Sequence, residues 1–169
     1  MRDTYAEYLV KHKNGVKETL LQLLIVFAAA FISFISVTFL AAFVGGLSAV
    51  VVVGVIYGAY YLVTSLFLEY ECIFTNGDLD VDKIICQRKR QRLVTVKCEN
   101  IEVLKKYVPE EHKNADYQTR IIAVEDEKKS ENYCIVARVQ GKGKTLVVFT
   151  PNDKILDAIK KFAPKHVVM

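Results

Sequence analysis

The chain has 169 residues, of which 52% are hydrophobic and 25% are charged, and its formal net charge is +4. Its 23 basic and 19 acidic residues all lie outside residues 19–68. This separation of an apolar segment from charge-rich segments excludes a single soluble globule and predicts three parts, residues 1–16, 17–68 and 69–169.

The first part, residues 1–16, is predicted to be a cytoplasmic N-terminal segment. Large side chains recur at helical spacing in it, at Tyr5, Tyr8, Leu9 and His12. This spacing predicts a short helix lying at the membrane surface. A polar tail without regular structure is the alternative.

The second part, residues 17–68, is predicted to form a transmembrane helical hairpin. A helix needs about 20 apolar residues to cross about 30 Å of hydrocarbon, and the uncharged run is long enough for two. Gly45-Gly46 interrupts it, because glycine permits a tight turn, so the helices are expected at residues 17–43 and 47–68. A cleaved signal peptide is the alternative, but the apolar run extends far beyond such a segment.

Basic residues stand on both sides of the hairpin and are absent from its turn. They are Arg2, Lys11, Lys13 and Lys17 before it and Lys83, Arg88, Lys89, Arg90 and Arg92 after it. Because basic residues stay on the cytoplasmic side, the sequence predicts a two-span protein of the cell membrane with both termini in the cytoplasm. The absence of ionisable groups from the spans favours an anchor over a transporter.

Small residues recur in both predicted helices. Gly54 and Gly58 form a GxxxG motif, and Ala29 and Ser33 have the same spacing in the first helix. Small side chains let helix backbones approach closely within a membrane. The favoured interpretation is packing of the two helices against each other, and a homo-oligomer face is the alternative.

The third part, residues 69–169, has enough residues for one small domain. Strand-like patterns occur at residues 70–75, 79–87, 92–97, 101–107, 119–125, 132–140 and 144–149. Asn76-Gly77 predicts a tight hairpin turn between the first two strands. An apolar stripe follows Pro151 and stops before Pro164, which predicts a C-terminal amphipathic helix. The fold class is therefore α+β, with a seven-stranded barrel or sandwich.

Three stretches carry a family resemblance: residues 70–85, residues 88–96 and residues 148–156. With the order of elements, they make this part resemble bacterial pleckstrin-homology-like (PH-like) domains. The whole chain resembles a family of small two-span membrane proteins from low-GC Gram-positive bacteria that has no established activity. The resemblance implies the fold and leaves the ligand open.

The residues that could support catalysis or metal binding are histidines, a serine, alternating aspartates and cysteines. The whole chain has three histidines, and its third part has a single serine. No nucleophile, base and orienting acid can be assembled from them, so no enzymatic activity and no cofactor are predicted. Asp78, Asp80 and Asp82 alternate, but the glycine and glutamate of a calcium loop are missing, which favours a solvated strand face. The cysteines lack zinc-ligand spacing and are expected to be reduced thiols, namely Cys72, Cys86, Cys98 and Cys134.

The candidate contact site is the basic cluster of Arg88, Lys89, Arg90 and Arg92, which closely follows the second span. Basic residues near the inner leaflet attract anionic lipid. The alternatives are a solvated turn that fixes the topology and a protein contact. Nucleic acid is not predicted, because acidic residues are nearly as numerous as basic ones.

The sequence thus predicts a membrane-anchored, non-catalytic PH-like binding module. Its partners would be membrane lipids and a protein or peptide not identified by the sequence. A structural or assembly protein acting through the hairpin is the alternative.

Overall fold

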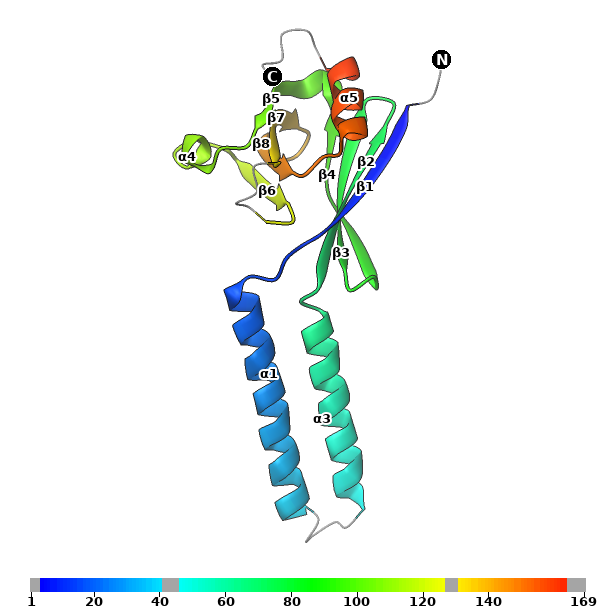
Figure 1. Ribbon diagram of the computed structural model, residues 1–169, viewed down its shortest axis with the longest axis vertical. Helices are drawn as coiled ribbons and strands as arrows, with labels where there is room; N and C mark the ends of the chain where they lie inside the picture. Colours follow the sequence, from blue (N-terminus) through cyan, green and yellow to red (C-terminus); the bar gives the residue numbers. More distant parts are fainter. Residues whose placement is uncertain (1–3, 41–45, 127–130, 164–169) are drawn as a thin grey trace. The chain divides into compact units, whose positions relative to one another are not determined.

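The computed structural model describes residues 4–40, 46–126 and 131–163 (Figure 1). The chain divides into two compact units. The strand unit combines the segment up to Lys13 with the chain from Leu68 onward, and the helical unit is Asn14–Phe67. The sequence predicted a separate part over residues 1–16. In the structure the segment up to Lys13 instead belongs to the strand unit.

The helical unit contains α1 (Val16–Ile35), the π-helical turn η1 (Ser36–Leu40) and α3 (Leu47–Thr64). α1 and α3 lie side by side within this unit (Figure 1). α3 ends at Thr64 rather than at the predicted residue 68, which is the first residue of β2. Residues 41–45, with the predicted end of the first helix and Gly45 of the predicted turn, lie outside the described residues.

Both helices are long and apolar enough to cross a membrane, over Val16–Phe39 and Leu47–Thr64. Only 6% of each apolar window is buried, which distinguishes these helices from the buried core helices of a soluble protein. Hydroxyl groups are satisfied inside the helices: Ser36 Oγ donates to the Ile32 carbonyl at 2.8 Å, and Thr64 Oγ1 donates to the Tyr60 carbonyl at 2.8 Å. Such internal bonds suit an apolar environment, where water cannot replace them.

The strand unit consists of two four-stranded sheets and two helices. The first sheet is antiparallel, in the order β1 (Tyr5–Lys11), β2 (Leu68–Thr75), β3 (Asp78–Ile85) and β4 (Lys89–Lys97). The 3-10 turn η2 (Cys98–Asn100) leads into the second sheet, in the order β5 (Ile101–Lys106), β7 (Tyr133–Val139), β8 (Gly143–Phe149) and β6 (Thr119–Ala123). The helices are α4 (Pro109–His112) and α5 (Asp153–Phe162).

The predicted N-terminal helix is wrong, because the segment forms strand β1. β1 pairs with β2 in an antiparallel register that runs from Tyr5↔Thr75 to Lys11↔Glu69. Ala6 and Val10 face the core with 8% and 5% exposure, as expected for the two-residue period of a strand. The partner strand lies beyond the helical unit in sequence, so spacing within the segment could not reveal the pairing.

The predicted barrel is also corrected, and one strand is added to those predicted. Within the described residues, the chain from Leu68 onward forms seven strands, β2–β8, and β1 is an eighth that comes from the N-terminal segment. They form two open four-stranded sheets rather than a closed barrel. β1 and β4 are the edge strands of the first sheet, and β5 and β6 are those of the second.

The main core lies between the sheets and beneath α5. Its fully buried side chains include Phe74, Leu79 and Phe149 from strands and Ile155 and Ile159 from α5. The predicted turn between β2 and β3 is confirmed, because Asn76 and Gly77 have φ angles of +48° and +103°. This turn places the start of β3 beside α5.

Candidate functional site

Two members of the predicted basic cluster cover a row of acids on the outer face of the first sheet. Arg90 forms ion pairs with Glu71 and with Asp82, the latter at 3.1 Å. Arg92 pairs with Asp82 and lies 2.7 Å from Asp80. The Asp82 side chain is only 2% exposed, so these arginines compensate a buried charge.

The cluster therefore does not form one free basic surface. Arg88 lies in the turn between β3 and β4, where its backbone N–H donates to the Ile85 carbonyl at 2.9 Å, and Lys89 begins β4. All four basic side chains are on an exposed part of the unit. The acidic row is also not simply solvated, since Thr95 Oγ1 donates to Asp80 at 2.6 Å beside the arginine contacts.

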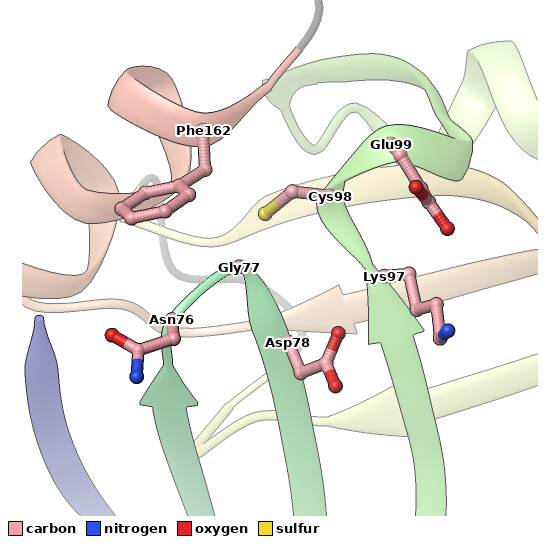
Figure 2. Close-up of a pocket in the computed structure, with 7 residues that line it drawn as sticks. All are labelled: Asn76, Gly77, Asp78, Lys97, Cys98, Glu99 and Phe162. Carbon is pink, nitrogen blue, oxygen red and sulfur yellow. The ribbon is translucent and has the colours of Figure 1, made fainter. Parts of the chain in front are cut away.

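One hollow of about 310 Å³ lies where α5, the β2–β3 turn and η2 meet (Figure 2). Cys98 N–H donates to the Gly77 carbonyl at 2.8 Å, and the Phe162 ring packs on Phe74 with centroids 5.5 Å apart. In Figure 2 the Cys98 sulfur lies on the Phe162 side of the chain, whereas the Glu99 side chain extends away from it. The hollow therefore lies where the β2–β3 turn, η2 and α5 pack together.

A larger groove of about 520 Å³ lies between β4 and the end of β7. It runs along β4 from Arg92 to Lys97, meets η2 at one end, and is bounded opposite by Arg138, Val139 and the turn that contains Lys142. Among its charged side chains, four are basic and one is acidic. Of the predicted contact residues, only Arg92 lines this groove.

A third hollow of about 590 Å³ separates the start of β1 from α5. Its α5 side carries Lys154, Lys160 and Lys161 together with Asp157. It provides a second basic surface, similar in charge to the groove beside β4.

A buried aromatic cluster packs on the second sheet, and its histidine lies between the strands predicted at residues 101–107 and 119–125. His112 of α4 is 5% exposed, its Nδ1 lies 2.7 Å from the Tyr117 hydroxyl, and its Nε2 lies 3.4 Å from Cys134 Sγ. Its ring stacks on Tyr107 with centroids 5.7 Å apart. The only sequence signal was the occurrence of Tyr107 and Tyr117 on either side of the charged residues around His112.

The His112–Cys134 pair does not have the electrostatics of a nucleophile and its base. Burial lowers the pKa of His112, and the nearby Lys105 lowers it further. Burial raises the pKa of the Cys134 thiol. Both groups are thus held neutral, whereas a reactive cysteine needs its thiolate.

The other cysteines are thiols without a disulfide partner. Burial raises the pKa of Cys72 and of Cys98 to about 12, with smaller contributions from Asp82 and Asp78, respectively. Cys86 is half-buried. Within the described residues, no group of three or more His, Cys, Asp or Glu side chains is placed to hold a metal ion.

The predicted helix-packing residues fall into two groups. Ala29 and Ser33 line a groove between α1 and α3, opposite Ala59. A Cβ added at Gly54 or Gly58 would meet nothing within 4 Å, so these glycines do not provide a close approach between the two helices. Their predicted packing against the first helix is therefore not supported.

The strand unit is thus an α+β unit of two four-stranded sheets with the C-terminal helix α5 packed on its core. The chain matches the family described as "Bacterial PH-like domain (DUF6106)" over residues 2–169, and it therefore belongs to that family. PH-like domains are generally non-catalytic binding modules. Comparisons with curated proteins and with solved structures give no match.

Proposed function

We propose that the protein is a membrane-tethered PH-like binding module whose strand unit lies at the cytoplasmic face. The proposal rests on one observation. β1 precedes the helical unit in the sequence and β2 follows it, yet the two strands pair with each other. β1 ends at Lys11 and β2 begins at Leu68, and His12 N–H donates to the Leu68 carbonyl at 2.9 Å. The apolar helices are thus inserted between two neighbouring strands of one sheet.

This insertion constrains the topology. Strands that pair in one sheet lie on the same side of a membrane, so the inserted segment must cross it an even number of times or not at all. Two apolar helices meet this condition with one crossing each. The basic residues on both flanks, such as Lys11 and Lys13 before the helices, favour the cytoplasmic side for the strand unit.

The exposed side chains of the helices support membrane insertion. Leu24 and Phe27 of α1 are 65% and 73% exposed, and Tyr57 of α3 is 69% exposed. Such continuous apolar surface is unfavourable in water and favourable in lipid. A tether of this kind would hold the strand unit close to its ligand at the membrane.

A second candidate function, assembly through the helices, is favoured by the open space beside Gly54 and Gly58. Glycines on an otherwise apolar helix surface allow close contact with another membrane helix. A homo-oligomer or a larger membrane partner would use this face. This role is compatible with the binding function of the strand unit.

Labelling with a membrane-impermeant maleimide tests the proposed topology. Cys86→Ser provides the background, since the other thiols are buried, and single cysteines are added as Glu7→Cys, Gly46→Cys or Lys142→Cys. In intact cells we expect only Gly46→Cys to react, and the other two to react after permeabilisation. Labelling of Glu7→Cys and Lys142→Cys from opposite sides would overturn the proposal.

A further inference from the structure

The groove beside β4 contains an unpaired strand edge. β4 pairs with β3 along one edge, and no other strand of the described residues pairs with its second edge. The groove follows this second edge between Arg92 and Lys97. Free backbone groups on a strand edge accept an extended peptide as an additional strand.

The charges around this edge favour an acidic ligand. The lining has four cationic side chains and one anionic side chain, namely Arg92, Lys97, Arg138 and Lys142 against Glu99. Arg92 is already engaged by carboxylates of β3. Arg138 contacts Glu102 through Nε at 3.0 Å, which leaves its terminal amino groups as donors. Lys97 and Lys142 make no ion pair with any described residue.

Apolar surface lies between these charges. Leu93 and Val139 line the groove and are both half-buried. Successive side chains of an added strand point to opposite faces. A peptide in which acidic and apolar residues alternate would therefore place carboxylates beside the cations and apolar side chains beside Leu93 or Val139.

We propose that this groove binds an extended acidic segment of a partner protein by adding it to the edge of β4. The inference rests on the proposed binding function, since it names the class of partner that the module takes. A lipid headgroup or a free phosphate has the required negative charge but offers no backbone groups for the strand edge. An extended peptide satisfies both features of the groove.

Selection of peptides tests this proposal on the full chain in detergent. A library of random peptides of about twelve residues, long enough to span one strand, is selected against the purified protein. We expect enrichment of sequences with alternating acidic residues and few prolines, and protection of β4 amides from hydrogen exchange when a selected peptide is bound. Absence of acidic enrichment, or protection elsewhere but not in β4, would overturn the proposal.

Two matched triple variants identify the binding surface. Replacing Lys97, Arg138 and Lys142 by Gln should weaken binding of a selected peptide by about tenfold or more. The same charge change at Lys154, Lys160 and Lys161, beside the third hollow, should leave the affinity within about twofold. The proposal is wrong if both variants lose affinity equally or if only the second one does.

Anionic vesicles and inorganic phosphate provide the remaining comparison. If phosphatidylglycerol vesicles or phosphate bind through the β4 groove and no acidic peptide does, the groove is a headgroup or phosphate site and the peptide proposal fails. The measurements are made in detergent and do not depend on membrane sidedness. Failure here is therefore distinguishable from failure of the proposed topology.

Discussion

Asp82 is the residue on which the outer face of the first sheet depends most. Its carboxylate is almost fully buried and contacts both Arg90 and Arg92. The alternating aspartates and the basic cluster were each visible in the sequence. Their pairing was not, because it requires the register in which Asp82 lies opposite Arg92 and Arg90 lies opposite Ile84.

We predict that Asp82→Ala lowers the free energy of unfolding by about 2 kcal/mol, since it leaves Arg90 and Arg92 without their shared partner. Asp78→Ala is the matched control, because Asp78 is exposed on the same strand, and should cost less than about 0.5 kcal/mol. Thermal unfolding of the two variants in detergent measures the difference. Equal costs would show that the ion pairs contribute no more than an exposed aspartate.

His112 gives the strand unit a predicted pH dependence. Burial lowers its pKa in the folded chain, Lys105 and Arg120 lower it further, and Glu111 partly opposes them. The unfolded chain therefore binds this proton more readily, so the free energy of unfolding falls as the pH drops below about 6.5, the ordinary histidine value.

The pH effect is expected first in the segment around α4, seen as lower hydrogen-exchange protection factors at Tyr107 and Tyr117 at pH 5 than at pH 7, each relative to the intrinsic exchange rate at that pH. His112→Phe keeps an aromatic ring in the cluster without the titrating group. It should flatten the pH dependence. An unchanged pH profile in this variant would assign the effect to another group.

At the element scale, the β2–β3 turn depends on Gly77 in two ways. Its φ of +103° strains any other residue, and an added Cβ would lie 3.3 Å from Phe162 Cδ1 of α5. Gly141 also has a positive φ, of +77°, but has open space around it. A comparison of substitutions at Gly77 and Gly141 therefore separates the destabilisation due to backbone strain from that due to contact with α5.

We predict that Gly77→Ala destabilises the strand unit by about 1–2 kcal/mol and Gly141→Ala by about 1 kcal/mol. Gly77→Ala should lower the free energy of unfolding less in a Phe162→Leu background than in the wild-type background, because the ring that contacts the added methyl group is gone. Urea or thermal unfolding gives these differences. A larger cost for Gly141→Ala would show that contact with Phe162 is unimportant.

The helical unit offers a parallel comparison on α3. Because a Cβ at Gly54 or Gly58 meets nothing within the unit, Gly54→Ile with Gly58→Ile should leave α1–α3 packing intact and reduce self-association in detergent. Ala59→Ile, placed in the groove toward α1, should disturb the packing of the two helices. Unchanged self-association in the double variant would exclude this face as a homo-oligomer contact.

At the scale of the whole molecule, local patterns predicted what depends on local sequence. The uncharged run marked the apolar helices, Asn76-Gly77 marked its turn, and alternation located strands after residue 68. The place of β1 beside β2 depends on a contact across the whole helical unit. The burial of His112 depends likewise on a fold that brings α4 over β7. The β1–β2 pairing has no signature in neighbouring residues, and the His112 cluster has only the aromatic rings on either side of it.

The most direct test is whether β1 pairs with β2 when the protein is embedded in a membrane by its helices. Glu7 and Ile73 are opposite each other in the register, so Glu7→Cys with Ile73→Cys, in the Cys86→Ser background, should form a disulfide rapidly when membranes are oxidised. Glu7→Cys with Lys97→Cys, which joins the two edge strands of the same sheet, is the control. Rapid cross-linking of the first pair alone supports helices inserted between paired strands, whereas equal rates for the two pairs would contradict it.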